Sequence, residues 1–234
     1  MGLLPNYFFE KPLWKKNLLV IGVDEVGRGA LAGPVVSGAV AFFPPLLQKK
    51  FTNINFPDFE TLGINDSKKL TQIKREHFSK IIKKHSLCWG IGATTAGMID
   101  KKGIVWATQR SMRLAIKNAQ ERLFSRLGGN SWQLNSYLLI DAFHIKYVPE
   151  IGLKNQKPII KGDEKSISIA AGSIIAKVYR DKLMAKLSQK SSRWKMYGWQ
   201  KNKGYGTKQH RESIEANGFS RHHRKSFCRS IDID

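Results

Sequence analysis

Three apolar stretches of this sequence each run directly into acidic residues, and this pattern constrains the fold more than any other feature. Residues 18–23 lead into Asp24 and Glu25, residues 137–140 into Asp141, and residues 158–162 into Asp163. Short apolar runs bounded by glycine or polar residues indicate buried strands. We therefore expect a sheet in which separate strands each end at a carboxylate.

The spacing of apolar residues predicts five strands and two long helices. The strand-like runs are apolar or alternate in polarity, and they cover residues 18–24, 35–43, 86–94, 137–141 and 158–161. Apolar residues recur at close to 3.6-residue intervals through residues 104–127 and 167–187, as in helices that pack on a sheet. The expected fold class is α/β, in the order three strands, helix, two strands, helix and a basic tail.

The charge of the chain points to a polyanionic partner. The 234 residues include 40 lysines and arginines but only 18 aspartates and glutamates, which gives a formal net charge of +22. Cationic side chains gain affinity for phosphate backbones by releasing condensed counterions, so we expect nucleic acid as the partner. The same charge suits a non-catalytic RNA-binding or ribosome-associated protein, so the charge alone does not identify an enzyme.

Other features favour a cytoplasmic protein with no membrane association. No apolar run approaches the ~20 residues of a membrane span, and the N-terminus lacks the basic-then-apolar order of a signal peptide. The two cysteines, Cys88 and Cys228, are too few for a disulfide framework or a zinc site. We expect both to be reduced thiols.

The C-terminal region carries half of the net charge. Between Lys182 and Arg229 there are thirteen lysines or arginines against two glutamates, and five aromatic residues lie among them: Trp194, Tyr197, Trp199, Tyr205 and Phe219. Aromatic side chains among cations suit base or sugar stacking beside phosphate contacts. They suit equally a helical cap whose aromatic residues dock it onto the core. The composition does not separate the two interpretations.

The acids that follow the strands favour metal chemistry. Active sites of open α/β sheets lie outside strand ends, so acids from separate strands can converge there. Packed carboxylates repel one another unless a cation neutralises them, and Mg²⁺ or Mn²⁺ prefers oxygen ligands. A single such aspartate is more often a turn or cap residue. Adjacent residues of an extended strand point to opposite faces, so Asp24 and Glu25 can share a site only where the strand ends or twists.

A glycine motif follows the first acids. Gly27 and Gly29 flank Arg28 in a pattern that superficially matches a dinucleotide-binding turn. Such a turn begins a helix, whereas Pro34 and the valines after it predict another strand. Backbone amides exposed by the two glycines can instead bind a phosphate or a ribose hydroxyl.

These stretches, taken together, resemble the bacterial ribonuclease HII family. The resemblance begins with the string from Gly22 to Gly29 and continues through residues 31–36. Further matching strings follow in family order, at residues 65–70, 139–141, 161–163, 169–181 and 203–210. The resemblance covers roughly residues 18–227.

The resemblance implies an RNase H-like fold, with a five-stranded mixed sheet flanked by helices and a basic C-terminal helical extension. It implies an endonuclease that cleaves the RNA strand of RNA/DNA hybrids and nicks duplex DNA on the 5′ side of embedded ribonucleotides, leaving a 3′-hydroxyl and a 5′-phosphate. The family's four catalytic, metal-binding acids fall on Asp24, Glu25, Asp141 and Asp163, for Mn²⁺ or Mg²⁺, with two ions in the substrate complex.

The resemblance also implies the groups that recognise the substrate. The family motif that senses the 2′-hydroxyl falls on Gly27, Arg28 and Gly29, and the tyrosine that stacks on the next deoxyribose falls on Tyr205. We expect a monomer with a catalytic domain at residues 1–187 and a substrate-contacting region at residues 188–234. Residues 1–17 are expected to form an extension and residues 43–62 a loop or insertion, neither with an assigned role.

A few residues depart from the family pattern or compete for a role in the site. Ala142 stands where many relatives have glycine, and its small size predicts little consequence. Asp181 is expected to be a salt-bridged surface residue, and His144 a supporting residue rather than a ligand. The cluster at residues 222–225 is expected to contact phosphate. A different nuclease of the same fold, such as a resolvase, is a further alternative.

Overall fold

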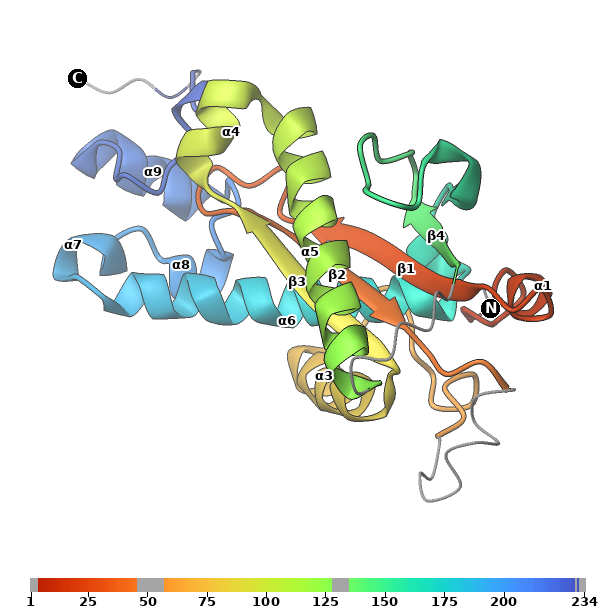
Figure 1. Cartoon of the computed structure of the whole chain (residues 1–234). Helices are drawn as coiled ribbons and strands as arrows, with labels where there is room; N and C mark the ends of the chain where they lie inside the picture. Colours follow the sequence, from red (N-terminus) through yellow and green to blue (C-terminus); the bar gives the residue numbers. More distant parts are fainter. Residues whose placement is uncertain (1–3, 46–56, 128–134, 230, 232–234) are drawn as a thin grey trace.

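The computed structural model describes residues 4–45, 57–127, 135–229 and 231, which form a sheet covered by helices (Figure 1). The sheet has five strands in the order β3-β2-β1-β4-β5. The strands are β1 (Leu19–Val26), β2 (Val35–Ala41), β3 (Cys88–Thr94), β4 (Ser136–Asp141) and β5 (Gln156–Ile159). β1, β2 and β3 pair antiparallel, whereas β4 and β5 continue parallel to β1. The five predicted strands are confirmed, with ends shifted by at most two residues.

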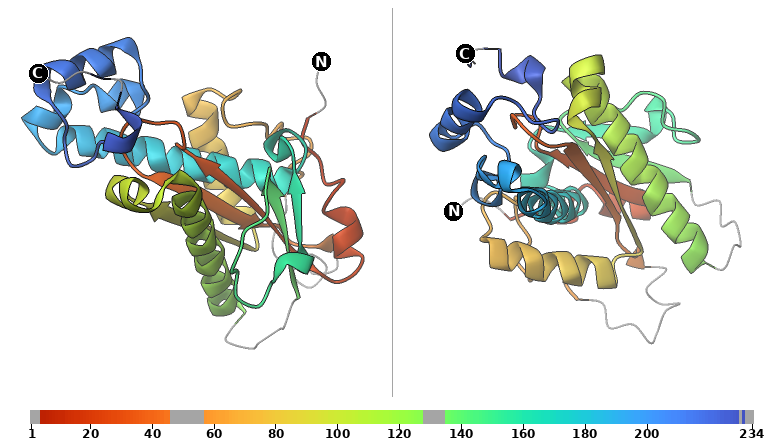
Figure 2. Two further views of the ribbon diagram at one scale, coloured as in Figure 1. Left: turned by 90° about the horizontal axis from the view of Figure 1, so that it is seen from above. Right: turned by 90° about the vertical axis from the view of Figure 1, so that its left-hand side faces the viewer.

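Helices cover both faces of the sheet (Figure 2). The two predicted long helices are confirmed as α5 (Ile104–Arg126) and α6 (Ile167–Gln189). α5 packs on β3 and β2, and α6 packs on β1 and β2, while α3 (Gln72–His85) lies against α6. The shorter helical elements are α1 (Lys11–Trp14), α4 (Ala96–Lys102), α7 (Ser192–Lys195), α8 (Trp199–Asn202), α9 (Lys208–Asn217), η1 (Leu153–Asn155), η2 (Gly162–Glu164) and η3 (Lys225–Phe227).

Glycines let α6 approach the sheet at backbone distance. A Cβ at Gly22 on β1 would lie 2.1 Å from the carbonyl carbon of Ser168, and one at Gly38 on β2 would lie 2.1 Å from the carbonyl oxygen of Gly172. The contact buries almost the whole inner side of α6, including Ile169. This close packing fixes the helix relative to the strand that carries Asp24.

The C-terminal region docks on the core through its aromatic residues. Tyr197 and Trp199 are fully buried, with ring centroids 5.3 Å apart and nearly parallel planes. The indole nitrogen of Trp199 donates to Nε2 of His210 at 3.0 Å. For these side chains the interpretation as a docked cap is confirmed. Residues 230 and 232–234 of the expected region lie outside the described residues.

The expectation that residues 222–225 contact phosphate is wrong for two of them. His223 is buried within the aromatic cluster, and its Nδ1 accepts from the backbone N–H of Ser220 at 2.9 Å. Arg224 is fully buried and donates to the carbonyl oxygens of Gly33 and Arg28, at 2.9 and 2.7 Å. Both side chains therefore hold the C-terminal region against the loop that follows β1.

The N-terminal segment, to which the sequence assigned no role, secures the start of α6. Glu10 is fully buried, and its Oε1 accepts from Oγ of Ser166 at 2.6 Å and from the backbone N–H of Ser168 at 3.0 Å. Asn6 forms a parallel bridge with Ser166. The segment thus anchors the turn between Asp163 and α6. Residues 1–3 of the expected extension lie outside the described residues.

The expected loop or insertion at residues 43–62 is described only at its two ends, because residues 46–56 lie outside the described residues. At its C-terminal end the ring of Phe59 packs against Phe42, with centroids 4.4 Å apart. Among the described residues, no helix combines the length and the apolar character that crossing a bilayer requires.

Candidate active site

Asp24 and Asp141 lie side by side at the centre of the sheet. The last β1–β4 pair is Val23 with Ile140, so the next residue of each strand is an aspartate. Equivalent positions on neighbouring strands place their side chains on the same face. The sequence prediction that the first acids cap β1 is wrong by two residues, because pairing with β2 continues to Val26. Convergence of acids from two strands is nevertheless present.

Asp163 joins this pair through a turn that is bonded to β4. Oδ1 of Asp141 accepts from the backbone N–H of Gly162 at 2.7 Å, which fixes the η2 turn and its Asp163 beside the strand. Ala142 and Lys161 adopt φ values of 66° and 54° where the chain leaves β4 and enters η2. Alanine disfavours this left-handed conformation, whereas glycine adopts it freely. At position 142 the glycine of the family pattern is therefore explained by backbone geometry more than by the small size of the residue.

Glu25, the next residue along β1, is held by an arginine. Its Oε1 lies 3.3 Å from NH1 of Arg28, in an ion pair that is partly exposed on the arginine side. Burial raises the pKa of Glu25 above its ordinary value, the Arg28 charge opposes this shift, and the Asp141 charge adds to it. Glu25 therefore interacts with both the acid cluster and the glycine loop.

The cluster concentrates negative charge in a buried place. Burial raises the pKa of Asp24 well above its ordinary value, and the charges of Glu25, Asp141 and Asp163 raise it further. Burial, Asp66 and Asp141 raise the pKa of Asp163 to about 6. Carboxylates that raise one another's pKa in this way are stabilised in their charged form by a cation. The structure thus brings together all four acids that the sequence singled out.

A lysine and a further aspartate border the cluster. Nζ of Lys68 lies 3.7 Å from Oδ2 of Asp163 and 4.0 Å from Oδ1 of Asp66, which is buried. No role was assigned to either residue from the sequence, although both lie in the family-like string at residues 65–70. The presence of the acid Asp66 within that string is the one sequence feature that points to a place near the cluster.

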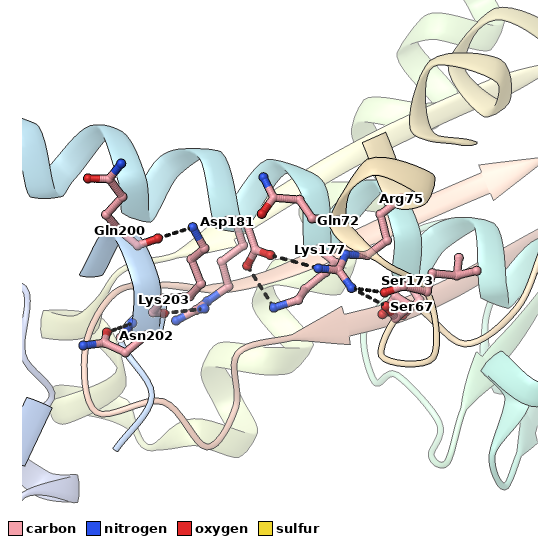
Figure 3. A network of polar contacts seen from close by, with 12 residues as sticks. Ser67, Gln72, Arg75, Ser173, Lys177, Asp181, Gln200, Asn202 and Lys203 are labelled. Carbon is pink, nitrogen blue, oxygen red and sulfur yellow. Dashed lines mark hydrogen bonds and ion pairs between the residues drawn. The ribbon is translucent and has the colours of Figure 1, made fainter. Parts of the chain in front are cut away.

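Two serines link the cluster to α3, and Figure 3 shows both of them beside Arg75 of that helix. The Oγ atoms of Ser67 and Ser173 lie 2.9 Å apart, and a hydrogen bond from Ser173 stabilises the ionised form of Asp24. Because each hydroxyl has one proton, Ser173 can donate to Asp24 only while it accepts from Ser67. NH1 of Arg75 donates to the carbonyl oxygen of Ser67 at 2.9 Å, which fixes this chain of contacts to α3.

A cavity of about 570 Å³ opens beside the acids, and we call it the site cavity. Its lining combines Glu25 with the glycine loop and the predicted tyrosine, namely Gly27, Arg28, Gly29 and Tyr205, together with Ser67, Lys68, Arg75, Ser173 and Lys177. The predicted recognition residues, which are far apart in sequence, therefore meet in one space next to the acid cluster.

A buried arginine holds two walls of the site cavity in place. Arg180 is fully buried and donates to the carbonyl oxygens of Ala32, Pro34 and Lys203, all at 2.9–3.0 Å. Its guanidinium lies 5.2 Å from the ring centroid of Tyr205, within cation–π distance. The side chain thus ties the loop after β1 to the segment that carries the tyrosine.

Asp181 and His144 lie outside the acid cluster. The predicted salt bridge of Asp181 is present, with Lys177 Nζ at 2.9 Å and Arg75 NH2 at 3.9 Å (Figure 3). The predicted surface location is wrong, because Asp181 is buried between α3 and α6. His144 is exposed.

The donor chemistry of the cluster fits a hard divalent cation, although the side chains are turned toward protein partners. Among the described residues, no three His, Cys, Asp or Glu side chains are already arranged to hold a metal ion. Oδ1 of Asp24 accepts from the backbone N–H of Glu25 at 2.7 Å, and Asp141 and Glu25 bind Gly162 and Arg28. Carboxylates that rotated away from these partners would offer the oxygen ligands that Mg²⁺ or Mn²⁺ prefers.

Comparisons with known proteins agree on one family. The family model described as Ribonuclease HII matches residues 21–230. Ribonuclease HII of Bacillus cereus strain Q1 is 43% identical over 227 residues, which cover 96% of this chain and 75% of the relative. The crystal structure of ribonuclease H2 from Pyrococcus horikoshii OT3 is similar with a TM-score of 0.59 and 27% identity, covering 92% of this chain and 97% of that chain.

The fold likeness extends to a second ribonuclease type. The structure of Bst-RNase HIII in complex with Mn²⁺ has a TM-score of 0.59 and 21% identity, and the match covers 90% of this chain and 65% of that chain. At this identity the likeness concerns the fold alone.

Proposed function

The chain belongs to the ribonuclease HII family, and we propose that it nicks duplex DNA on the 5′ side of embedded ribonucleotides, leaving a 3′-hydroxyl and a 5′-phosphate. Ribonuclease H activity follows from the family itself, and a non-catalytic RNA-binding role has no support among the relatives. The observation that carries the proposal is the meeting of Glu25 with the glycine loop and Tyr205 in the site cavity, next to the cluster that Glu25 forms with the other three acids.

We propose Asp24, Glu25, Asp141 and Asp163 as the ligands of Mg²⁺ or Mn²⁺, with two ions in the substrate complex. The mutual repulsion of these buried carboxylates supports the assignment, as does Mn²⁺ in the related Bst-RNase HIII structure. Bound there, the ions would activate the attacking water and stabilise the leaving 3′ oxygen. Lys68 partly neutralises Asp163, so its ammonium group would be displaced or would turn toward substrate phosphate.

We propose that the loop at Gly27, Arg28 and Gly29 reads the ribose 2′-hydroxyl. A Cβ added at Gly29 would meet nothing within 4 Å, so no protein contact requires glycine there. A bare backbone does allow a substrate sugar to approach the amide groups closely. Arg28, already bonded to Glu25, couples this loop to the acids.

We further propose that exposed cations of residues 188–229, such as Lys201 and Lys208, contact the backbone of the bound duplex. Most aromatic residues of this region are used in docking, so its contribution to binding is electrostatic. The enzyme is proposed to act as a monomer in the cytoplasm.

Cleavage of a defined duplex tests the proposed function. A double-stranded DNA with one embedded ribonucleotide should be nicked once, on the 5′ side of that ribonucleotide, when Mg²⁺ or Mn²⁺ is added. The all-DNA duplex of the same sequence and a reaction with a chelator serve as controls, and neither should be cut. The end groups are read by ligation and by labelling with a kinase. Absence of a nick with both metals rules out the proposal.

Tyr205 is expected to contribute stacking to junction cleavage. Replacing it with alanine should slow nicking at a single ribonucleotide by about 5- to 150-fold, since stacking on an aromatic ring is worth about 1–3 kcal/mol. Tyr205→Phe keeps the ring and should retain most of the rate. Single-turnover rates on the junction duplex and on a uniform RNA/DNA hybrid measure the effect. Equal rates for Tyr205→Ala and the wild type on the junction would remove the assigned role.

A further inference from the structure

A row of neighbouring cavities leads from the site cavity along α3 toward the free edge of the sheet, each sharing lining residues with the next. The site cavity and the next cavity share Arg75, and that second cavity shares Glu76, Val178 and Lys182 with a third. The third cavity shares Lys83 and Tyr179 with a fourth, of about 990 Å³, that lies along β3. We call the second, third and fourth cavities together the α3 groove. Figure 2 shows α3 crossing α6 on the side of the sheet opposite α5.

The middle and the far end of the α3 groove are lined by cations that have no acidic partner. The four lysines of its middle part are Lys80, Lys83, Lys182 and Lys186, and two arginines, Arg122 and Arg126, line its far end. Within the described part of the chain, no carboxylate lies within ion-pair distance of any of the four lysines. Burial and the charges of Lys182 and Arg122 lower the pKa of Lys83. The cations therefore repel one another in the free protein.

The acids of the groove do not neutralise these lysines. Asp181 is already paired with Lys177 and Arg75 at the entrance (Figure 3). Oε1 of Glu76 accepts from Gln72, one turn earlier in α3, at 3.0 Å. Glu121 lies 3.7 Å from Lys117, which does not line the groove. A net positive charge thus remains along the whole path.

Aromatic side chains occupy the far end of the groove. Trp89 on β3 has the guanidinium of Arg122 at 3.8 Å and Nζ of Lys83 at 4.6 Å from its ring. Tyr179 on α6 lines the same cavity and is 42% exposed, although it is a large ring. Tyr179 thus offers an exposed ring beside the cations, and cationic grooves with accessible aromatic rings are common in proteins that bind single-stranded nucleic acid.

A peptide in an extended conformation is the alternative ligand for such a groove, and the edge of β3 is poorly suited to it. Such a peptide binds by pairing its main chain with a free sheet edge. Here Nδ2 of Asn118 donates to the carbonyl oxygen of Ile91 at 2.7 Å, and NH1 of Arg126 donates to that of Leu87 at 3.1 Å. Side chains from α5 therefore already use carbonyl groups at and just before this strand, whereas the four lysines have no carboxylate partner.

We propose that the α3 groove binds single-stranded nucleic acid, such as an unpaired strand that continues from a duplex held at the acids. The phosphates would meet the four lysines, and a base would stack on Tyr179. This inference rests on the proposed function for the origin of the strand, but the binding itself does not depend on cleavage. No residue assigned to metal or ribose binding lines the α3 groove. The groove shares only Arg75 with the site cavity.

Binding without metal tests the inference separately from the proposed function. Fluorescence anisotropy of a labelled 20-nucleotide oligothymidylate, in chelator, compares wild type with the triple variant Lys83→Glu, Lys182→Glu and Lys186→Glu. The matched control carries the same charge change at three exposed lysines elsewhere, Lys15→Glu, Lys16→Glu and Lys154→Glu. The groove variant should bind at least tenfold more weakly at about 0.1 M salt, and the control no more than about threefold.

The salt dependence gives a second measure. For single strands the slope of log affinity against log salt is about −0.7 per neutralised phosphate, so loss of three contacts should reduce its magnitude by about 2. The milder variant Lys83→Gln, Lys182→Gln and Lys186→Gln should weaken binding to an intermediate degree without lowering the melting temperature. Equal losses in the groove and control variants would show a general charge effect and overturn the proposal.

Further outcomes distinguish this inference from the proposed function and from binding of an acidic polypeptide. Nicking of a blunt duplex with one ribonucleotide should be unchanged in the groove variant, whereas any advantage of a duplex with a long overhang should disappear. If wild type nicks neither duplex, the proposed function fails while the anisotropy result still decides the groove. If poly-glutamate binds as tightly as the oligonucleotide, with the same dependence on the three lysines, the ligand is an acidic polypeptide and the assignment to nucleic acid is wrong.

Discussion

Replacement of Asp24 by asparagine is expected to abolish nicking while the protein remains folded. Asp24 is buried, and it interacts electrostatically with all three other proposed ligands, Glu25, Asp141 and Asp163. Asparagine has nearly the same shape but removes the charge and one anionic ligand. Since a bound metal supplies several kcal/mol of transition-state stabilisation, we expect the rate to fall by about 10³-fold or more.

The same substitution should not destabilise the metal-free protein at neutral pH. The folded-state pKa values of Asp24 and Asp163 are raised above their ordinary value of 3.8. A group with a raised pKa contributes stability that is present at low pH and lost as the pH rises through its folded pKa. For Asp163 this window lies between about pH 4 and 6, and for Asp24 it ends at the raised pKa of that group. At neutral pH the buried charge of Asp24 therefore destabilises the folded state, and Asp24→Asn removes this destabilisation.

Two measurements separate these effects. Melting temperatures in chelator at pH 5.5 and pH 8 should show that Asp24→Asn equals or exceeds wild type at pH 8, with a smaller difference at pH 5.5. Single-turnover nicking with Mg²⁺ and with Mn²⁺ gives the catalytic loss. Asp58→Asn, at an exposed aspartate before Phe59, is the control and should behave as wild type. Turnover of Asp24→Asn above a tenth of the wild-type value would disprove the ligand assignment.

The sheet and its acids could be predicted because they depend on local patterns. β1 and β2 are buried along nearly their whole length, so their apolar runs identify them as strands. The order of strands and acids then places Asp24 and Asp141 at one region of the sheet. The end of β1 could not be predicted, since pairing with β2 alone carries it past Asp24 to Val26.

Contacts between distant segments account for what the sequence did not reveal. Asp66 reads as a turn residue, and it does accept from the backbone N–H of Lys68 at 2.9 Å. Asp66 also lies near Asp163, because Nζ of Lys68 is within ion-pair distance of both carboxylates. This arrangement depends on how the loop before α3 lies over the sheet. A single sequence has no local signal for that placement.

Neither buried arginine could be predicted from the sequence. Arg224 belongs to the basic tail, where cations suggest solvent or phosphate contacts, and Arg180 belongs to α6, yet both are 0% exposed. Their guanidinium groups satisfy carbonyl oxygens of the loop between Arg28 and Pro34, which has few strand partners of its own. Burying an arginine is favourable only where such acceptors converge, and that convergence is a property of the tertiary fold.

Gly22→Ala is expected to destabilise the protein strongly. The new Cβ would lie 2.1 Å from the carbonyl carbon of Ser168 and 2.4 Å from the nitrogen of Ile169, in the first turn of α6. Backbone atoms cannot rotate away as a side chain can, so the start of α6 must move off the sheet. Overpacking of this kind costs about 1–3 kcal/mol and occasionally more, and we expect the upper end of that range here.

The displacement should also reduce activity in the molecules that remain folded. Gly22 precedes Asp24 by two residues. The helix α6 carries Ser173, which bonds to Asp24, and it begins just after the turn that holds Asp163. Moving the helix therefore alters the spacing of the acids. We expect a melting temperature lower by about 6–10 °C, since 1 kcal/mol corresponds to about 2–4 °C for a domain of this size, and a reduced nicking rate well below that temperature.

Gly97→Ala is the matched control, because it adds the same methyl group to an exposed position of α4 that has no atom within 4 Å of the new Cβ. Alanine in a helix is favoured over glycine by about 0.5–1 kcal/mol, so this variant should melt at the wild-type temperature or slightly higher and nick at the wild-type rate. Melting curves and single-turnover rates of the two variants are compared under the same conditions. If Gly22→Ala melts within 1 °C of Gly97→Ala, α6 is not held against β1 at backbone distance. The positioning of Asp24 and Asp163 by that contact would then have to be abandoned.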